Sequence, residues 1–140
     1  MIVYNALDVK IPKFPRRKVS NWIKVITEMY NKRVGDVSYI FCSEGEILSI
    51  NKEYLKHDYF TDIITFAYSI NDTISGDIFI SLETVKSNAF QFKVPFENEL
   101  YRVMIHGILH LCGLCDKSKH QKELMRISEN QALSLLFDFF

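Results

Sequence analysis

The sequence predicts a single α+β domain over residues 1–140, in which helices pack on a mixed sheet of about four strands. Stretches with the apolar pattern of strands are grouped between stretches with the apolar spacing of helices, and this grouping favours α+β over other classes. No repeat, low-complexity segment or linker divides the sequence. A chain of 140 residues is also long enough for one core that needs no disulfide support.

The first half of the chain predicts two strands and two helices. Residues 2–7 are apolar enough for a short strand, and residues 37–41 predict another. Between them, apolar residues at helical spacing indicate a helix over about residues 16–33, with Gly35 as its stop. Residues 46–54 predict a short helix. The apolar stripe of the longer helix consists of Val19, Trp22, Ile23, Ile26 and Tyr30.

The second half predicts a hairpin and three helices. Residues 61–70 are β-branched and aromatic with apolar residues on both faces, which is typical of a strand inside a sheet. A short polar turn separates them from residues 74–82, so an antiparallel hairpin is expected. Helices are expected over residues 81–92, 95–112 and 119–136. The predicted apolar face of the last helix comprises Leu124, Met125, Ile127, Ala132, Leu135 and Leu136.

Composition and charge narrow the classes of function. The formal net charge is +0, so any binding of nucleic acid must come from local basic patches. Three cysteines do not suggest a disulfide framework. The N-terminus lacks the charged and apolar blocks of a signal peptide, and no apolar run is long enough to span a bilayer. We therefore expect a cytoplasmic protein with neither a membrane partner nor a dinucleotide cofactor.

The helix expected over residues 95–112 carries two histidines, His106 and His110, four residues apart. Residues at this spacing lie one above the other on a helix face, so both imidazoles can reach one ion. Gly113 offers a left-handed turn where the helix can end, and the returning chain can present Asp116 to the same point. Three protein ligands with a fourth position open to water are typical of a catalytic zinc site.

The order His-x3-His-x2-Gly-x2-Asp follows the ligand layout of metzincin-type zinc proteases. Those enzymes need a glutamate directly after the first histidine as general base, and Gly107 stands there, which disfavours a peptidase. His120 is an alternative third ligand by residue type. It falls in the first turn of the next helix, however, where side chains tend to face solvent. We therefore expect one zinc ion per chain, bound by His106, His110 and Asp116.

The metal motif, His106-Gly107-x-Leu109-His110-Leu111-x-Gly113-x-x-Asp116, is similar to the signature of the YbeY family. Two upstream segments resemble further family motifs: residues 50–54 together with residues 61–66, and residues 76–81. The three blocks occur in family order. The resemblance implies a small α+β fold with the metal helix against a four-stranded sheet. It also implies a zinc-dependent, single-strand-specific endoribonuclease of ribosomal RNA maturation and ribosome quality control, which hydrolyses phosphodiesters with a metal-activated water.

The chain departs from the YbeY pattern at three positions. Asp116 stands where many members carry a third histidine, and Phe60 stands where a proline is expected. Leu55 replaces an arginine that the family pattern implies as a phosphate contact. Without that arginine, the positive charge must come from another residue, and Lys56 and His57 are two candidates.

Arg102 is the best-placed candidate for the catalytic cation. On the predicted helix it lies one turn before His106 and points roughly the same way. The alternative explanation of Arg102 is a surface ion pair with Glu99. Asp62, which falls in one of the YbeY blocks, is either a structural residue at a strand end or part of the site.

RNA, in the form of ribosomal RNA precursors, is the expected partner, with the ribosomal subunit as a second candidate. Three lysines directly after the metal motif are candidates for holding the RNA backbone: Lys117, Lys119 and Lys122. A non-catalytic RNA- or ribosome-assembly module with structural zinc is the alternative that Leu55 keeps open. The metal is open as well, since histidine and carboxylate ligands also suit nickel, cobalt and iron.

Overall fold

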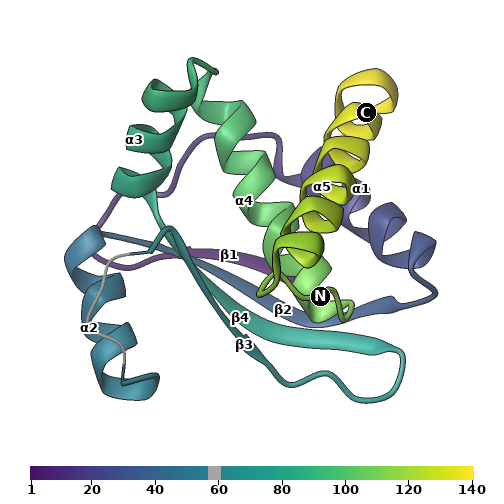
Figure 1. Ribbon diagram of the computed structural model, residues 1–140, viewed down its shortest axis with the longest axis horizontal. Coiled ribbons are helices and arrows are strands. Elements are labelled where there is room, and N and C mark those ends of the chain that lie inside the picture. The colour runs from purple at the N-terminus through teal and green to yellow at the C-terminus, as the bar shows by residue number, and fades with distance from the viewer. Residues whose placement is uncertain (57–60) are drawn as a thin grey trace.

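The structure is a computed structural model that describes residues 1–56 and 61–140. Every strand and helix expected from the sequence is present, in the expected order. The elements are β1 (Ile2–Ala6), α1 (Arg16–Met29), β2 (Arg33–Cys42), α2 (Glu44–Tyr54), β3 (Ile63–Ala67), β4 (Thr73–Ser81), α3 (Leu82–Phe92), α4 (Phe96–Leu111) and α5 (Lys119–Phe139). Figure 1 shows α4 between α3 and α5.

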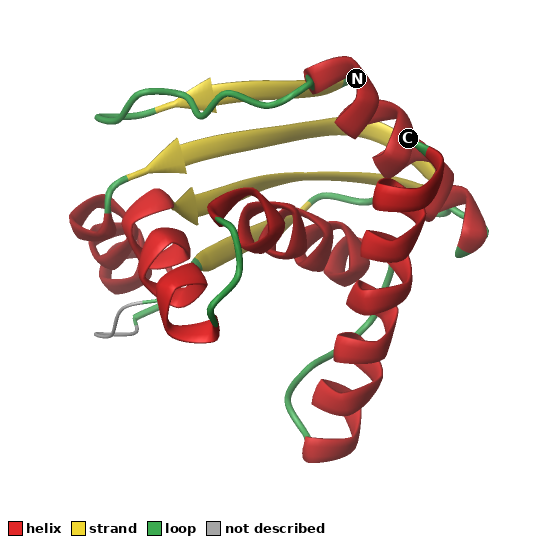
Figure 2. Ribbon diagram, turned by 90° about the horizontal axis from the view of Figure 1, so that it is seen from above, coloured by secondary structure: helices red, strands yellow, loops and turns green. Residues whose placement is uncertain are grey.

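The four strands form one mixed sheet in the order β1-β2-β4-β3. β1 and β4 both pair with β2 in parallel, and β3 pairs with β4 as the expected antiparallel hairpin. Figure 2 shows α1, α4 and α5 gathered on one side of this sheet. The predicted α+β class, with helices packed on a mixed sheet of four strands, is therefore confirmed.

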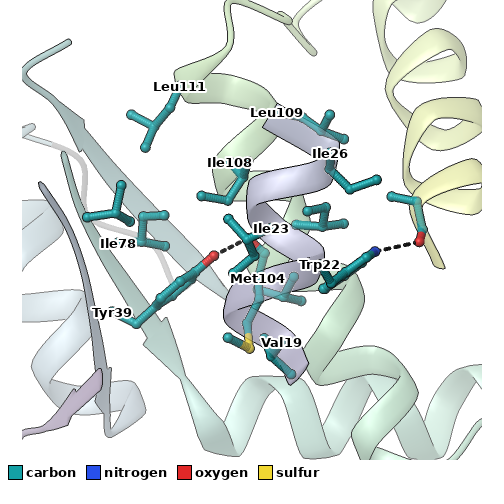
Figure 3. Packing of buried hydrophobic residues seen from close by; sticks show 14 of the residues in the cluster. Val19, Trp22, Ile23, Ile26, Tyr39, Ile78, Met104, Ile108, Leu109 and Leu111 are labelled. Atoms are coloured by element: carbon teal, nitrogen blue, oxygen red, sulfur yellow. Dashed lines mark hydrogen bonds between the residues drawn. The ribbon is translucent and has the colours of Figure 1, made fainter. Parts of the chain in front are cut away.

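The main core lies between the sheet and the helices α1, α4 and α5, with α4 at its centre (Figure 3). α4 contacts β3, β4, α1, α3 and α5. Two buried polar groups are satisfied by backbone carbonyls within this core. The hydroxyl of Tyr39 donates to Met104 at 2.9 Å, and the indole N–H of Trp22 donates to Ala132 at 2.7 Å. These bonds tie α4 to β2 and α5 to α1, so the helix layer has one arrangement on the sheet.

A smaller apolar cluster lies on the opposite face of the sheet, under α2. Side chains alternate along β4, so Ile78 and Ile80 join the main core while Phe79 packs against the smaller cluster. The buried members of that cluster are Cys42, Ile47, Ile50 and Ile64. The apolar residues expected on both faces of the hairpin are explained by these two clusters.

Two details of the predicted elements are wrong. The first helix ends at Met29, and Gly35 lies inside β2 rather than stopping the helix. The helix ends instead where Asn31 adopts a left-handed conformation, with φ of 59°.

The predicted apolar face of α5 also needs correction. Leu124 and Ile127 are exposed, because the stripe that faces the core is turned away from them. Successive buried residues of α5 are one, three or four positions apart, so they share the helix face that packs on the core. They are Met125, Glu129, Ala132, Leu133 and Leu136. The helix also continues past Leu136 to Phe139. In the described parts of the chain, no helix combines the length and apolar character that crossing a bilayer requires.

The close approach of α4 to the sheet depends on a residue without a side chain at Gly76. A Cβ atom built there would lie 2.5 Å from the backbone oxygen of Phe66 and 3.0 Å from Leu111 Cδ2. The first contact is with backbone of the paired strand β3, which cannot move aside without disturbing the hairpin.

We expect Gly76→Ala to destabilise the fold by about 1–3 kcal/mol, because the added methyl group overpacks a filled site. Gly45→Ala is the matched control, since a Cβ there meets nothing closer than Ser43 Oγ at 4.0 Å. The measurement is chemical or thermal unfolding of both variants. Equal stability of the two variants would contradict the packing argument.

Candidate metal centre

The two predicted histidines lie together on the last two turns of α4, at the boundary between the core and solvent. The ring centroids of His106 and His110 are 4.5 Å apart, at an interplanar angle of 80°. Both side chains are partly exposed, whereas Ile105, Ile108 and Leu109 beside them are fully buried. The helix is therefore fixed by its apolar face while both imidazoles stay accessible.

The chain reverses after α4 and brings a carboxylate to both rings. Gly113 has φ of +104°, and the N–H of Leu114 donates to the carbonyl of Leu109 at 3.0 Å. Oδ2 of Asp116 then lies 3.2 Å from Nε2 of His106 and 3.4 Å from Nε2 of His110. The geometry thus brings together the three residues predicted as ligands. Ligand atoms of the three side chains lie within 4.8 Å of one another.

His120, the alternative ligand by residue type, does not belong to this group. It lies exposed in the first turn of α5, as its position two residues after the cap Ser118 predicts. The structure therefore places Asp116, and not His120, at the histidine pair.

Both imidazoles are held in the tautomer that a metal ion requires. Nδ1 of His110 lies 2.9 Å from the carbonyl oxygen of Leu114, and Nδ1 of His106 lies 2.7 Å from Oε2 of Glu129. A carbonyl and a carboxylate only accept hydrogen bonds, so both Nδ1 atoms carry the proton. In the neutral rings Nε2 is then a lone-pair donor, and both Nε2 atoms face Asp116. Two imidazole nitrogens and one carboxylate oxygen fit a divalent ion such as zinc.

Glu129 of α5 is the residue of the site that the sequence did not single out. It is buried, accepts the hydrogen bond of His106, and forms an ion pair with Arg102 through Oε1 at 3.0 Å. A carboxylate that orients a metal-binding histidine in this way is common in metal sites. The signal for it was present, because Glu129 lies in the buried stripe of α5 between Met125 and Leu133, where a charge needs a partner.

Arg102 lies beside the histidines as predicted, but its partner differs from the one expected. Its Nη1 pairs with Glu129, and its Nη2 donates to Oδ1 of Asn130 at 2.8 Å. Arg102 therefore forms its ion pair with Glu129 of α5, and not with Glu99 of its own helix. Arg102 connects α4 to α5 and still lines the open cleft described next.

The three predicted ligands line a cleft of about 700 Å³, hereafter the metal cleft. Its lining includes His106, His110, Asp116, Asp62, Arg102 and Glu129. This location supports a site role for Asp62.

The electrostatics of the metal cleft couple these groups. Burial raises the pKa of Asp62 above its ordinary value, although the charge of His106 offsets part of the effect. Burial lowers the pKa of His106, but its hydrogen bond to Glu129 and the charges of Glu129, Asp116 and Asp62 outweigh this and raise it overall. The surroundings therefore favour positive charge at the position where the ligands converge.

The lysines predicted as RNA contacts are exposed and flank the metal cleft rather than line it. Lys117 lies in the loop after Asp116, and Lys119 and Lys122 lie in the first turn of α5. Arg126, one turn further along α5, does line the cleft. Of the other cations considered, Lys56 is exposed after α2, and His57 lies outside the described residues. Phe60, at the position of the expected proline, also lies outside them.

An α+β domain whose central helix presents two histidines to a carboxylate, in an open polar cleft, belongs to a class of proteins with a group of side chains that could hold a metal ion. Comparison with known proteins gives the family. The family model described as Endoribonuclease YbeY matches residues 4–136, and the chain belongs to this family.

Curated relatives match over nearly the full length of both chains. The Endoribonuclease YbeY of Phocaeicola vulgatus is 54% identical over 136 residues, which cover 97% of this chain and 99% of the relative. That of Bacteroides fragilis is 51% identical over 134 residues, covering 96% of each. A solution structure of the Thermotoga maritima protein TM1509 matches with a TM-score of 0.68 at 26% identity, covering 98% of this chain and 89% of that one. The resemblance read from the sequence is confirmed.

We expect Glu129→Gln to weaken zinc affinity about 10- to 100-fold, because the amide keeps the shape of the side chain but loses the charge that orients His106. Asn130→Ala is the matched control, since it removes a bond of Arg102 and leaves Glu129 in place. Competition with a chromophoric chelator measures both affinities. Wild-type affinity in Glu129→Gln would show that the carboxylate has no part in metal binding.

Proposed function

We propose that this chain is a zinc-dependent endoribonuclease that cleaves single-stranded RNA in the cytoplasm and acts in ribosomal RNA maturation and ribosome quality control. The observation that carries the proposal is the convergence of His106, His110 and Asp116 in an open cleft, in a chain of the endoribonuclease YbeY family. Precursor ribosomal RNA is the proposed substrate. We propose that the protein binds this RNA on the ribosomal subunit.

One zinc ion per chain would be held by Nε2 of both histidines and by the Asp116 carboxylate. When bound, zinc supplies a Lewis acid that polarises a phosphoryl oxygen and makes water a stronger nucleophile. The protein holds the ligands ready, because the hydrogen bonds at both Nδ1 atoms fix the rings before any ion arrives.

Arg102 is the proposed cation for the scissile phosphate. Its guanidinium has five N–H donors, more than the bonds to Glu129 and Asn130 use, and it lines the metal cleft. Positive charge beside the phosphate stabilises the additional negative charge of the transition state. Lys117, Lys119 and Lys122 would hold the RNA backbone where the strand leaves the cleft.

The structure disfavours both alternatives. A peptidase of the metzincin type needs a glutamate at position 107, but a Cβ at Gly107 would lie 3.0 Å from two carbon atoms of Ile78 in β4. This position serves the packing of α4 on the sheet. A structural zinc site uses four protein ligands in a closed arrangement. Within residues 1–56 and 61–140, the group consists of His106, His110 and Asp116, and these three residues line a cleft open to solvent.

We expect His106→Ala, His110→Ala and Asp116→Ala each to lose bound zinc and RNA cleavage while the fold is retained, because the two histidines lie outside the apolar face of α4 and Asp116 lies in the loop that follows it. His120→Ala is the control and should keep both. Metal content by mass spectrometry is measured on the same samples used to cleave single-stranded RNA, with and without chelator. A wild-type protein that holds zinc and leaves RNA intact would contradict the enzymatic proposal and favour an assembly role.

RNA binding should weaken as salt rises, because the contacts come from local cations on a protein of formal net charge +0. Replacing Lys117, Lys119 and Lys122 together with glutamine should reduce the slope of log affinity against log salt by about 2, at roughly 0.7 per lost contact. The control replaces Lys10, Lys13 and Lys18, which are also exposed, with glutamine, and its salt slope should stay that of the wild type. Equal slopes for the two triple variants would exclude the predicted lysine contacts.

A further inference from the structure

A second hollow, of about 320 Å³, adjoins the metal cleft and shares Phe92, Glu99, Arg102 and Arg126 with its lining. We name it the aromatic hollow, because Phe92 at the end of α3 and Phe137 near the end of α5 both line it. These two helices lie on either side of α4 (Figure 1). The hollow therefore extends the metal cleft between α3 and α5.

Both phenylalanines of the aromatic hollow are half exposed, at 51% each. Water-exposed aromatic rings gain little from folding, and a pair of them in a concave site is typical of a ligand-binding surface. Polar groups accompany the rings. Asn98, Asn130 and Ser134 also line the hollow, so hydrogen-bonding side chains lie beside the apolar faces.

The charge of the aromatic hollow suits a polyanion that enters from the metal cleft. Arg126 lines both spaces, and its side chain is 55% exposed. Arg126 pairs with the buried Glu129 at 3.9 Å, but Arg102 holds the same oxygen of that carboxylate at 3.0 Å. Glu99, the acid in the lining of the hollow, is buried. An exposed guanidinium at the junction can therefore meet a phosphate between a nucleotide in one space and a nucleotide in the other.

We propose that the aromatic hollow binds an unpaired nucleobase of the RNA strand that passes through the metal cleft. The base stacks on Phe92 and Phe137, the amides and hydroxyl meet its edge, and Arg126 contacts the connecting phosphate. This subsite rests on the proposed function and deepens it. It gives a physical source for single-strand preference, since a base in a duplex is stacked on both faces by its neighbours and must be unstacked to enter.

A nucleobase explains the hollow better than a protein partner does. A volume of about 320 Å³ is at the lower end of small-molecule sites, and its continuity with the metal cleft places any occupant next to the scissile phosphate. A second copy of the chain seated on these rings would lie against Arg102 and Arg126, which also line the metal cleft that the substrate must enter. The aromatic hollow is thus assigned to the substrate itself.

The test compares Phe92→Ala and Phe137→Ala with Phe90→Ala and Phe139→Ala. The control rings lie on the same two helices and are 88% and 76% exposed, but they line neither space. Affinity is measured by fluorescence anisotropy with a short single-stranded RNA and chelator-treated protein, so that the strand is not cleaved. We expect about tenfold weaker binding for each hollow variant, because a lost base–aromatic stack is of that size, and no change for the controls.

A matched oligonucleotide that lacks bases separates stacking from other causes. Wild type and the hollow variants should bind it equally, and Phe92→Tyr, which keeps the ring, should bind normal RNA as wild type does. Loss of affinity for the abasic strand in the hollow variants would overturn the proposal, as would affinities equal to those of the controls. Sedimentation that shows these residues hold a dimer would also overturn it. Failure of the wild type to bind or cleave RNA is a different result, which rejects the proposed function.

Discussion

The close contact of α4 with β3 and β4 is the constraint on which the site depends. Gly107 faces the sheet, and the Cβ of any other residue would lie 3.0 Å from Ile78 and 3.2 Å from Ile63. Fixing the helix at this depth and rotation also fixes the face it shows to solvent, since successive residues on a helix are about 100° apart. His106 and His110 therefore point into the cleft because Gly107 and the neighbouring apolar residues do not.

The metal centre also depends on the position of α5, because a single carboxylate links the two helices. Glu129 holds His106 on one oxygen and Arg102 on the other. A buried carboxylate without these partners would be costly, so the three groups stabilise one arrangement together. The indole N–H of Trp22 in α1 donates a hydrogen bond to the carbonyl of Ala132 in α5, and this bond holds α5 against α1. The geometry of the ligands is thus a property of the whole helix layer and not of the local motif alone.

Features built from residues close together in the sequence could be predicted, whereas features that depend on contacts between distant segments could not. The histidine pair and the turn to Asp116 lie within eleven residues, so helix geometry and one glycine were enough to place all three. Glu129 is 23 residues from His106, and only the packing of α5 brings them together. The helix stop predicted at Gly35 is wrong because a glycine also fits an irregular position in a strand, here at the register shift of β2 between Val34 and Val37. Phe92 and Phe137 could not be singled out from the sequence, since they lie on separate helices that come to line one hollow only because α3 and α5 both pack against α4.

Gly107 stands where a metzincin-type protease has its general base. On this helix the position serves packing against the sheet and cannot also supply a proton acceptor. In a metzincin-type protein, the position after the first histidine carries the proton acceptor. Here the same position is used to bring the helix within contact distance of Ile78 and Ile63. A glutamate at 107 would have to displace the side chains of Ile78 and Ile63 and bury a charge against an apolar sheet, and both changes destabilise the fold. The sheet contact that orients His106 and His110 is therefore also what disfavours peptide hydrolysis by that route. The same rotation of α4 places Arg102 in the cleft lining beside the two histidines, and arginine and histidine are residue types that suit an anionic substrate.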